Sequence, residues 1–204
     1  MDFWHGGCSF LDPNTEIANP DCVASNAARL DWLKNSPPGT VIVSNAVINM
    51  YRYVGLKSQD QTVFPSEGRQ VESDLTENLS GLVNQLQDLG NNVILVDPLP
   101  SFSFEETYWP VEGCGILSLA LNSCQIQVPR VLIDEQQEVV RDVLDTTAAR
   151  TGAGILDLNE EFCNESICSN SLGGILRYQD RSHISVDEGQ RLGPLFTQKI
   201  LSMS

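Results

Sequence analysis

The chain has 204 residues, of which 41% are hydrophobic and 15 are glycine, a composition typical of one globular domain with a substantial core. Its formal net charge of −15 argues against nucleic acid or anionic membrane surfaces as partners, because phosphate groups are bound by basic clusters. No apolar run approaches the roughly 20 residues of a membrane span, and residues 1–7 have neither the basic nor the apolar region of a signal peptide.

The first half of the chain predicts two helices and two strands. The helix expected over 22–35 has an apolar face of Val23, Ala27, Leu30 and Leu33. A short, wholly apolar strand over 40–44 follows, which is typical of a strand buried on both faces, and we expect the polar residues 54–70 to form a surface loop. The second helix, over 72–89, ends at Gly90 and has a face of Leu75, Leu79, Leu82, Val83, Leu86 and Leu89.

The second half continues the same alternation. Asn92 to Asp97 is a second buried strand, followed by a long irregular stretch over 101–130. A third helix over 133–151 and a third strand over 152–158 come next, and Ser185 to Glu188 is a capping-box pattern that opens a last helix over 186–202. Helices that alternate with wholly apolar strands predict an α/β fold with a parallel sheet covered on both faces. Sites in such folds gather at the carboxyl ends of the strands.

The cysteines indicate disulfides rather than a metal site. None forms a CxxC, and neither histidine stands at zinc-ligand spacing beside a cysteine pair, so we expect no metal and no cofactor. An even number in close pairs predicts three disulfides in an oxidising compartment, although six cysteines allow 15 pairings. Buried thiols in a cytosolic protein remain the alternative. The expected pairs are Cys8/Cys22, Cys114/Cys124 and Cys163/Cys168.

Asp180 and His183 are the strongest candidates for chemistry. The chain has only two histidines, and His183 follows Asp180 by three residues, in a polar loop just before a capped helix. The Asp180 carboxylate can accept the Nδ1 proton of His183 while Nε2 faces a nucleophile, which is the base half of a nucleophile–His–Asp triad. An exposed acid and histidine without a catalytic role is the alternative, and these residues alone do not decide between the two.

The string from Arg177 to Ser185 (Arg-Tyr-Gln-Asp-Arg-Ser-His-Ile-Ser) resembles the last motif block of SGNH hydrolases. More specifically, the chain resembles the SGNH domain attached to membrane acyltransferases of acyltransferase family 3. Further matches follow in the family's order, at Gly7-Cys8, at Cys22, from Leu86 to Pro100 and from Ile155 to Cys168. The resemblance implies a single SGNH-type (flavodoxin-like) domain over residues 1–204, with three α/β/α layers and a mostly parallel sheet.

The resemblance also implies a function. Members of the family are bacterial, lie on the periplasmic side of the inner membrane and help to transfer acetyl or other acyl groups from an acyl donor to a surface glycan. In the resemblance Asp180 and His183 are the triad acid and base, and a transmembrane acyltransferase domain is expected upstream. Two alternatives stay open. One is a carbohydrate or lipid esterase, and the other is a non-catalytic domain that binds glycan or supports a membrane partner.

Two family motifs are not matched. The nucleophile block, Gly-Asp-Ser, does not occur in this sequence, and neither Ser9 nor Ser44 stands in such a turn. Because residues 1–7 resemble the second strand of the family, we expect a domain that is incomplete at its N-terminus and lacks its first central strand. The oxyanion-hole block is not matched clearly either; Asn45 is the best-placed candidate and Asn49 a weaker one. A turn or helix-cap asparagine is the alternative for Asn45.

Overall fold

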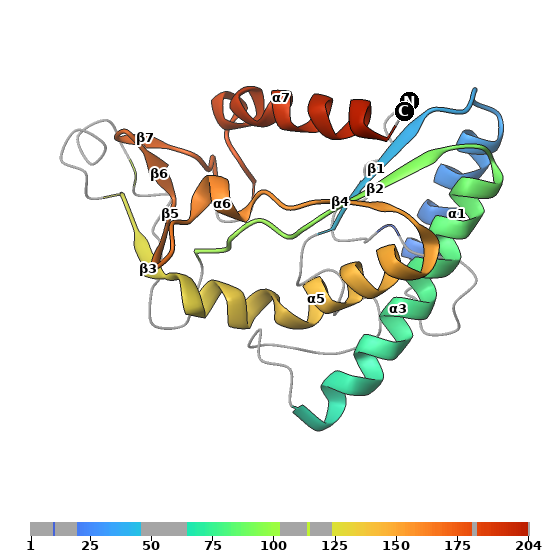
Figure 1. Cartoon of the computed structure of the whole chain (residues 1–204), viewed down its shortest axis with the longest axis horizontal. Coiled ribbons are helices and arrows are strands. Elements are labelled where there is room, and N and C mark those ends of the chain that lie inside the picture. The colour runs from blue at the N-terminus through green and yellow to red at the C-terminus, as the bar shows by residue number, and fades with distance from the viewer. Residues whose placement is uncertain are drawn as a thin grey trace. The chain divides into compact units, whose positions relative to one another are not determined.

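The computed structural model describes residues 10, 20–45, 65–102, 114, 124–180 and 183–203. The chain divides into two compact units, one made of Met1–Pro98, Gln137–Asp157 and Met203, the other of Leu99–Gln136, Leu158–Ser202 and Ser204. The helices and strands follow one another in this order (Figure 1): α1 (Pro20–Lys34), β1 (Thr40–Ser44), α3 (Pro65–Asp88), β2 (Asn92–Val96), β3 (Gln127–Pro129), α5 (Arg130–Thr151), β4 (Gly154–Leu156), α6 (Asn159–Phe162), β5 (Ile167–Ser169), β6 (Ser171–Leu172), β7 (Ile175–Leu176) and α7 (Val186–Ser202).

The first unit is built on a parallel sheet with the strand order β1-β2-β4. All three predicted strands and their parallel pairing are therefore confirmed. The central strand β2 is buried on both faces, from Val93 to Val96. The expectation that β1 is also buried on both faces is wrong, because Ile42 is 40% exposed. Within the described residues β1 pairs with β2 alone.

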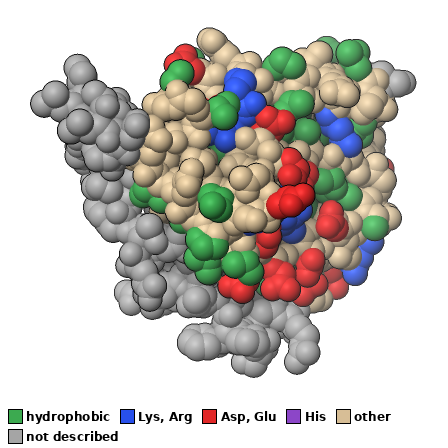
Figure 2. All heavy atoms as spheres, turned by 60° about the vertical axis from the view of Figure 1, so that its left-hand side comes forward, with side chains coloured by type: hydrophobic (Ala, Val, Ile, Leu, Met, Phe, Trp, Pro, Cys, Tyr) green, Lys and Arg blue, Asp and Glu red, His purple; other side chains and the backbone are tan. Residues whose placement is uncertain are grey.

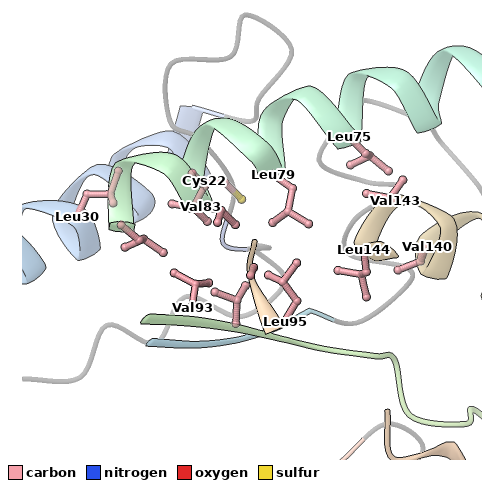
Figure 3. Close-up of a cluster of buried hydrophobic side chains, with 14 residues drawn as sticks. Cys22, Leu30, Leu75, Leu79, Val83, Val93, Leu95, Val140, Val143 and Leu144 are labelled. Atoms are coloured by element: carbon pink, nitrogen blue, oxygen red, sulfur yellow. The ribbon is translucent and has the colours of Figure 1, made fainter. Parts of the chain in front are cut away.

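One face of this sheet carries the core of the first unit (Figure 3). Side chains of α1, α3 and α5 pack there against Val43, Val93 and Leu95 of the strands. The α3 residues expected on the buried face are fully buried, namely Leu75, Leu79, Leu82, Val83 and Leu86. The long apolar stripe of this helix thus faces the core, where burial of its side chains stabilises the unit.

The buried face of α1 agrees with the predicted one only in part. The buried side chains of this helix are Cys22, Asn26 and Leu30, which follow one another at intervals of four residues, whereas Ala27 is exposed. Cys22 is disulfide-bonded. Leu30 and Leu33 of the predicted face pack in the core, whereas Cys22 and Asn26 are buried in place of Ala27.

The helix α3 begins earlier than predicted and ends where expected. It starts at Pro65 and not near residue 72, so part of the loop expected over 54–70 is helical. Proline is favoured in a first helical turn, where its missing N–H would have no partner. At the other end, Gly90 has a φ of 83°, its N–H donates to Gln87, and the Asn91 N–H donates to Leu86. These two bonds form a Schellman motif, which confirms Gly90 as the helix terminator.

The second unit contains short strands that the sequence analysis missed. β3 pairs antiparallel with β5, and β6 with β7. Asn170, fully buried between the two pairs, accepts from the Ile126 N–H at 2.8 Å and donates to the Cys124 carbonyl at 3.0 Å. Strands of two or three residues carry too little periodicity to be recognised in a sequence, so residues 127–129 were expected to be irregular.

The surface is acidic, as the net charge of −15 predicts. Acidic side chains gather on the face shown in Figure 2, where hydrophobic side chains lie in scattered groups among polar ones. Within the described ranges, every helix is too short or too polar to cross a membrane.

Candidate functional site

Asp180 and His183 are in direct contact. The Nδ1 atom of His183 lies 2.8 Å from Oδ2 and 3.0 Å from Oδ1 of Asp180. Asp180 Oδ1 also accepts the backbone N–H of His183 at 2.8 Å. An ionised carboxylate can only accept hydrogen bonds, so this contact places the proton of a neutral His183 on Nδ1 and the basic lone pair on Nε2. A turn-forming aspartate explains the backbone bond, but not the contact with the ring.

Both side chains are accessible to solvent. The side chain of His183 is 64% exposed and that of Asp180 is 49% exposed. An acid–base pair at such a position can exchange protons with water or with a substrate hydroxyl without any local opening. The ion pair contributes little to stability there, because solvent screens exposed charges.

Backbone hydrogen bonds close the loop that carries the pair. The N–H of Gln179 donates to the carbonyl of His183 at 2.9 Å, and the N–H of Ser185 donates to the carbonyl of Arg177 at 2.8 Å. Tyr178 and Ile184 form an antiparallel bridge between these two bonds. Residues 177–180 and 183–185 therefore form the two arms of a short hairpin, and Asp180 and His183 lie at the ends of these arms.

The buried side chain of Tyr178 anchors one arm of this hairpin. Its hydroxyl donates to the carbonyl of Pro100 at 2.7 Å, and its ring packs against Phe102 and Phe162, with centroids 5.4 and 5.6 Å away. Burial raises the pKa of the Tyr178 hydroxyl far above its ordinary value, so this group stays protonated and remains a donor.

Arg177, next to Tyr178, lies in a buried ion network. Arg177 and Glu188 are only 3% and 4% exposed, and the guanidinium donates to Glu188 Oε1 through Nε at 3.0 Å and through Nη2. Arg191 donates to the same carboxylate and, at 2.6 Å, to Glu161. Burial alone raises the pKa of Glu188, but the hydrogen bonds from Arg191 and Arg177 outweigh it and leave this pKa below its ordinary value.

The last helix begins as predicted, but its capping box is only half formed. The hydroxyl of Ser185 accepts the N–H of Glu188 at 3.2 Å, which makes Ser185 the N-cap of α7. In a complete box the glutamate would return a bond to the N–H of the serine. Here that N–H bonds to Arg177, and the Glu188 carboxylate is taken up by the two arginines.

Two of the expected disulfides lie among the described residues. They join Cys114 to Cys124 and Cys163 to Cys168, and the second bridges the two residues of a local antiparallel pairing. Cys22 is also disulfide-bonded, and its expected partner, Cys8, lies outside the described residues. The described part of the chain holds no group of three or more His, Cys, Asp or Glu side chains placed to bind a metal ion.

The oxyanion candidate Asn45 is engaged with the backbone. Its Oδ1 accepts the N–H of Phe10 at 2.9 Å, and its Nδ2 lies 3.5 Å from the Phe10 carbonyl. Both ends of the Asn45 amide therefore face the backbone of Phe10, 35 residues earlier in the chain, and its role as an oxyanion donor stays a prediction. The weaker candidate Asn49 and the serine Ser9 lie outside the described residues, and Ser44 is exposed at the end of β1.

A polar group that was not predicted from the sequence lies at the carboxyl ends of β2 and β4. Arg141 lies between two carboxylates, with Nε 3.4 Å from Asp97 and Nη2 3.2 Å from Asp157. Asp97 is 4% exposed, and no hydrogen-bond partner is present for its Oδ1 among the described residues. Burial, and then the charge of Asp157, raise the pKa of Asp97 to about 6, while Arg141 opposes them.

The missed residues left different signals in the sequence. An aspartate directly after a buried strand is a general sign of the functional edge of a parallel sheet, and Asp97 and Asp157 both stand there. Arg177 and Glu188 are 11 residues apart, and no local spacing rule pairs them. The sequence instead predicts that the Glu188 side chain bonds to the N–H of Ser185 in a capping box, whereas in the structure it bonds to Arg177.

Comparison with known proteins agrees with this fold. No curated protein matches the chain. A solved structure from Salmonella ser. Paratyphi A, the periplasmic domain of a lipopolysaccharide acetyltransferase, matches with a TM-score of 0.55 and 14% identity, over 95% of this chain and 68% of that one. This likeness confirms the predicted SGNH-type α/β fold. The family model described as "SGNH domain (fused to AT3 domains)" matches residues 1–198. The chain therefore belongs to the family of SGNH domains that are fused to AT3 domains.

Proposed function

We propose that this chain carries the base and the acid of an enzyme that transfers O-acyl groups, acetyl above all, to bacterial surface glycans through a Ser-His-Asp mechanism. The contact between Asp180 and Nδ1 of His183 carries the proposal, because it leaves the basic nitrogen, Nε2, on the other side of the ring. The family's fusion to AT3 domains and the acetyltransferase among its structural relatives support acyl transfer as the reaction class.

The reaction proceeds in two halves. Nε2 of His183 takes the proton of a serine hydroxyl while the serine oxygen attacks the acyl carbonyl of the donor, and the leaving group departs with that proton. A glycan hydroxyl then attacks the acyl-serine and gives its proton to Nε2, which returns it to the serine. Asp180 holds the ring and stabilises the imidazolium in both halves. Since Gly-Asp-Ser is absent from these 204 residues, the serine comes from a segment outside them.

An extracytoplasmic location is part of the proposal. The two described disulfides need an oxidising compartment. The relative from Salmonella is a periplasmic domain, and the family name records attachment to AT3 domains. We infer that this domain lies on the periplasmic side of the inner membrane, where an upstream transmembrane acyltransferase domain supplies the acyl donor.

Hydrolysis of a carbohydrate or lipid ester is the second candidate. The observation that favours it is the 64% exposure of the His183 side chain, which gives water access to the base. Both reactions use the same acid and base, so the ratio of transferred to hydrolysed acyl groups, measured with a labelled acetyl donor and a glycan acceptor, separates them. A ratio well below one supports the esterase.

The DNA upstream of Met1 offers the first test. An in-frame strand followed by Gly-Asp-Ser supports the enzyme, whereas a start codon with its own ribosome-binding site supports a non-catalytic domain. The second test compares residues 1–204 with a chain extended upstream through that block. We expect acyl-ester turnover only from the extended chain, and a loss of about 10²–10⁴-fold in His183→Ala.

Matched variants control this second test. Asp187→Asn removes an exposed acid in the first turn of α7, and His5→Gln removes the other histidine, so both should retain turnover. Asp180→Asn should lose it. Turnover by residues 1–204 alone would contradict the proposed source of the serine, and an active His183→Ala would contradict the mechanism.

A further inference from the structure

The hairpin that presents Asp180 and His183 has an exposed tip and a buried base. At the tip, the side chain of His183 is 64% exposed. At the base, Arg177 and Tyr178 are each 3% exposed. A short exposed loop samples several conformations unless its ends are held, so the side chains at the base determine how well the tip is defined.

Arg177 contacts both arms of the hairpin and the elements around it. Its N–H donates to the carbonyl of Asn170 at 2.9 Å, and its own carbonyl accepts the N–H of Ser185 at 2.8 Å. Its guanidinium lies 3.7 Å above the ring of Phe162 in α6 and donates twice to Glu188 in the first turn of α7. One residue thus joins both arms of the hairpin, α6 and α7.

We propose that Arg177, acting through Glu188, is a positioning residue that keeps the ring of His183 against Asp180. The inference rests on the proposed function only in naming His183 as the base. Arg177 itself contacts neither the Asp180 carboxylate nor the His183 ring in any described hydrogen bond. Arg177 instead fixes the base of the hairpin whose arms carry Asp180 and His183.

The chemistry of the site favours arginine over lysine. A planar guanidinium can stack on Phe162 and send two donors to Glu188 at the same time, whereas an ammonium is a point charge without a stacking face. Glu188 also keeps Arg191 as a partner, with bonds of 3.0 and 2.8 Å. Removal of Arg177 therefore leaves the buried carboxylate with a cation, and we expect the variant to fold.

The tautomer of His183 tests the proposal directly. Nitrogen NMR of the ¹⁵N-histidine-labelled protein in alkaline buffer distinguishes Nδ1–H from Nε2–H imidazole, and the two histidines of the chain are assigned by His5→Gln. We expect Nδ1–H to dominate in the wild type. Because one hydrogen bond sets this preference, Arg177→Met should lower the ratio of Nδ1–H to Nε2–H by roughly three- to tenfold. Arg177→Lys should fall between the two, and Asp180→Asn should show the largest loss.

Two controls remove a similar group elsewhere in the same unit. Arg130→Met removes an arginine paired with Glu160, and Glu161→Gln removes the far end of the ion network. Both should keep the wild-type ratio. If Arg177→Met does not fold, the same tautomer ratio is measured in Arg177→Lys and Glu188→Gln.

The proposal would be overturned if the folded Arg177 and Glu188 variants kept the wild-type ratio of Nδ1–H to Nε2–H. It would also be overturned if Arg130→Met lowered this ratio as much as Arg177→Met does. The tautomer is measured without substrate, so this result does not depend on activity. An active His183→Ala would overturn the proposed function while leaving the tautomer result unchanged.

Discussion

The buried carboxylate of Asp97 should make this protein less stable as the pH rises from about 4 to about 6. The pKa of Asp97 is raised from its ordinary value of 3.8 to about 6, chiefly by burial. Between these two values the folded protein binds more protons than the unfolded chain, so the free energy of unfolding falls with increasing pH. At 1.36 kcal/mol per pKa unit, the full loss is about 3 kcal/mol.

Asp97→Asn removes this titration while keeping the shape and the polar character of the side chain. The amide carries no charge, so the variant avoids the cost of burying an ionised carboxylate. We expect its free energy of unfolding to exceed that of the wild type by up to about 3 kcal/mol at pH 7, and the difference to vanish near pH 4. The assay is urea unfolding at a series of pH values under non-reducing conditions, followed by far-UV circular dichroism.

Two further variants make this test specific. Asp142→Asn, at an exposed position on α5 beside Arg141, should give a curve parallel to that of the wild type. Arg141→Met removes the cation that lowers the pKa of Asp97, so its loss of stability should extend to higher pH. A constant difference between wild type and Asp97→Asn across the pH range would refute the reasoning, because a non-titrating contact would then explain the whole effect.

Three other predictions follow from the core, the last helix and the disulfides. Leu79→Ala, at a fully buried site, should lower the free energy of unfolding by about 2–5 kcal/mol. Glu77→Ala, at an exposed site on the same helix, should change it by less than about 0.5 kcal/mol. Equal effects of the two substitutions would contradict the packing of α3. Ser185→Ala should cost about 1 kcal/mol in the same measurement, since it removes the N-cap of α7, and Ser202→Ala in the last turn is its control. Reduction should add six hydrogens to the intact mass, because no described cysteine is free; a gain of four would leave one pair unformed.

The sequence alone determined the features that depend on local spacing or on long periodic patterns. The leucines of α3 and the apolar run of β2 are strongly periodic or continuous, so their burial could be predicted. Asp180 and His183 are three residues apart along the chain, and so are Ser185 and Glu188, which form the cap of α7. These contacts join residues that are close along the chain, so local spacing was enough to predict the partners.

Other features were decided by the tertiary structure. Packing buries Cys22 and Asn26 on α1, and it leaves Ile42 of β1 40% exposed. The pKa of Asp97 depends on burial by distant segments and on Asp157, 60 residues further along the chain. Arg177 and Glu188 meet because the hairpin folds back onto α7.

Burial and long-range charge arise only when distant segments pack together, and no single stretch of sequence contains them. The candidate acid and base could therefore be identified from the sequence. The buried arginine that we propose holds them could not.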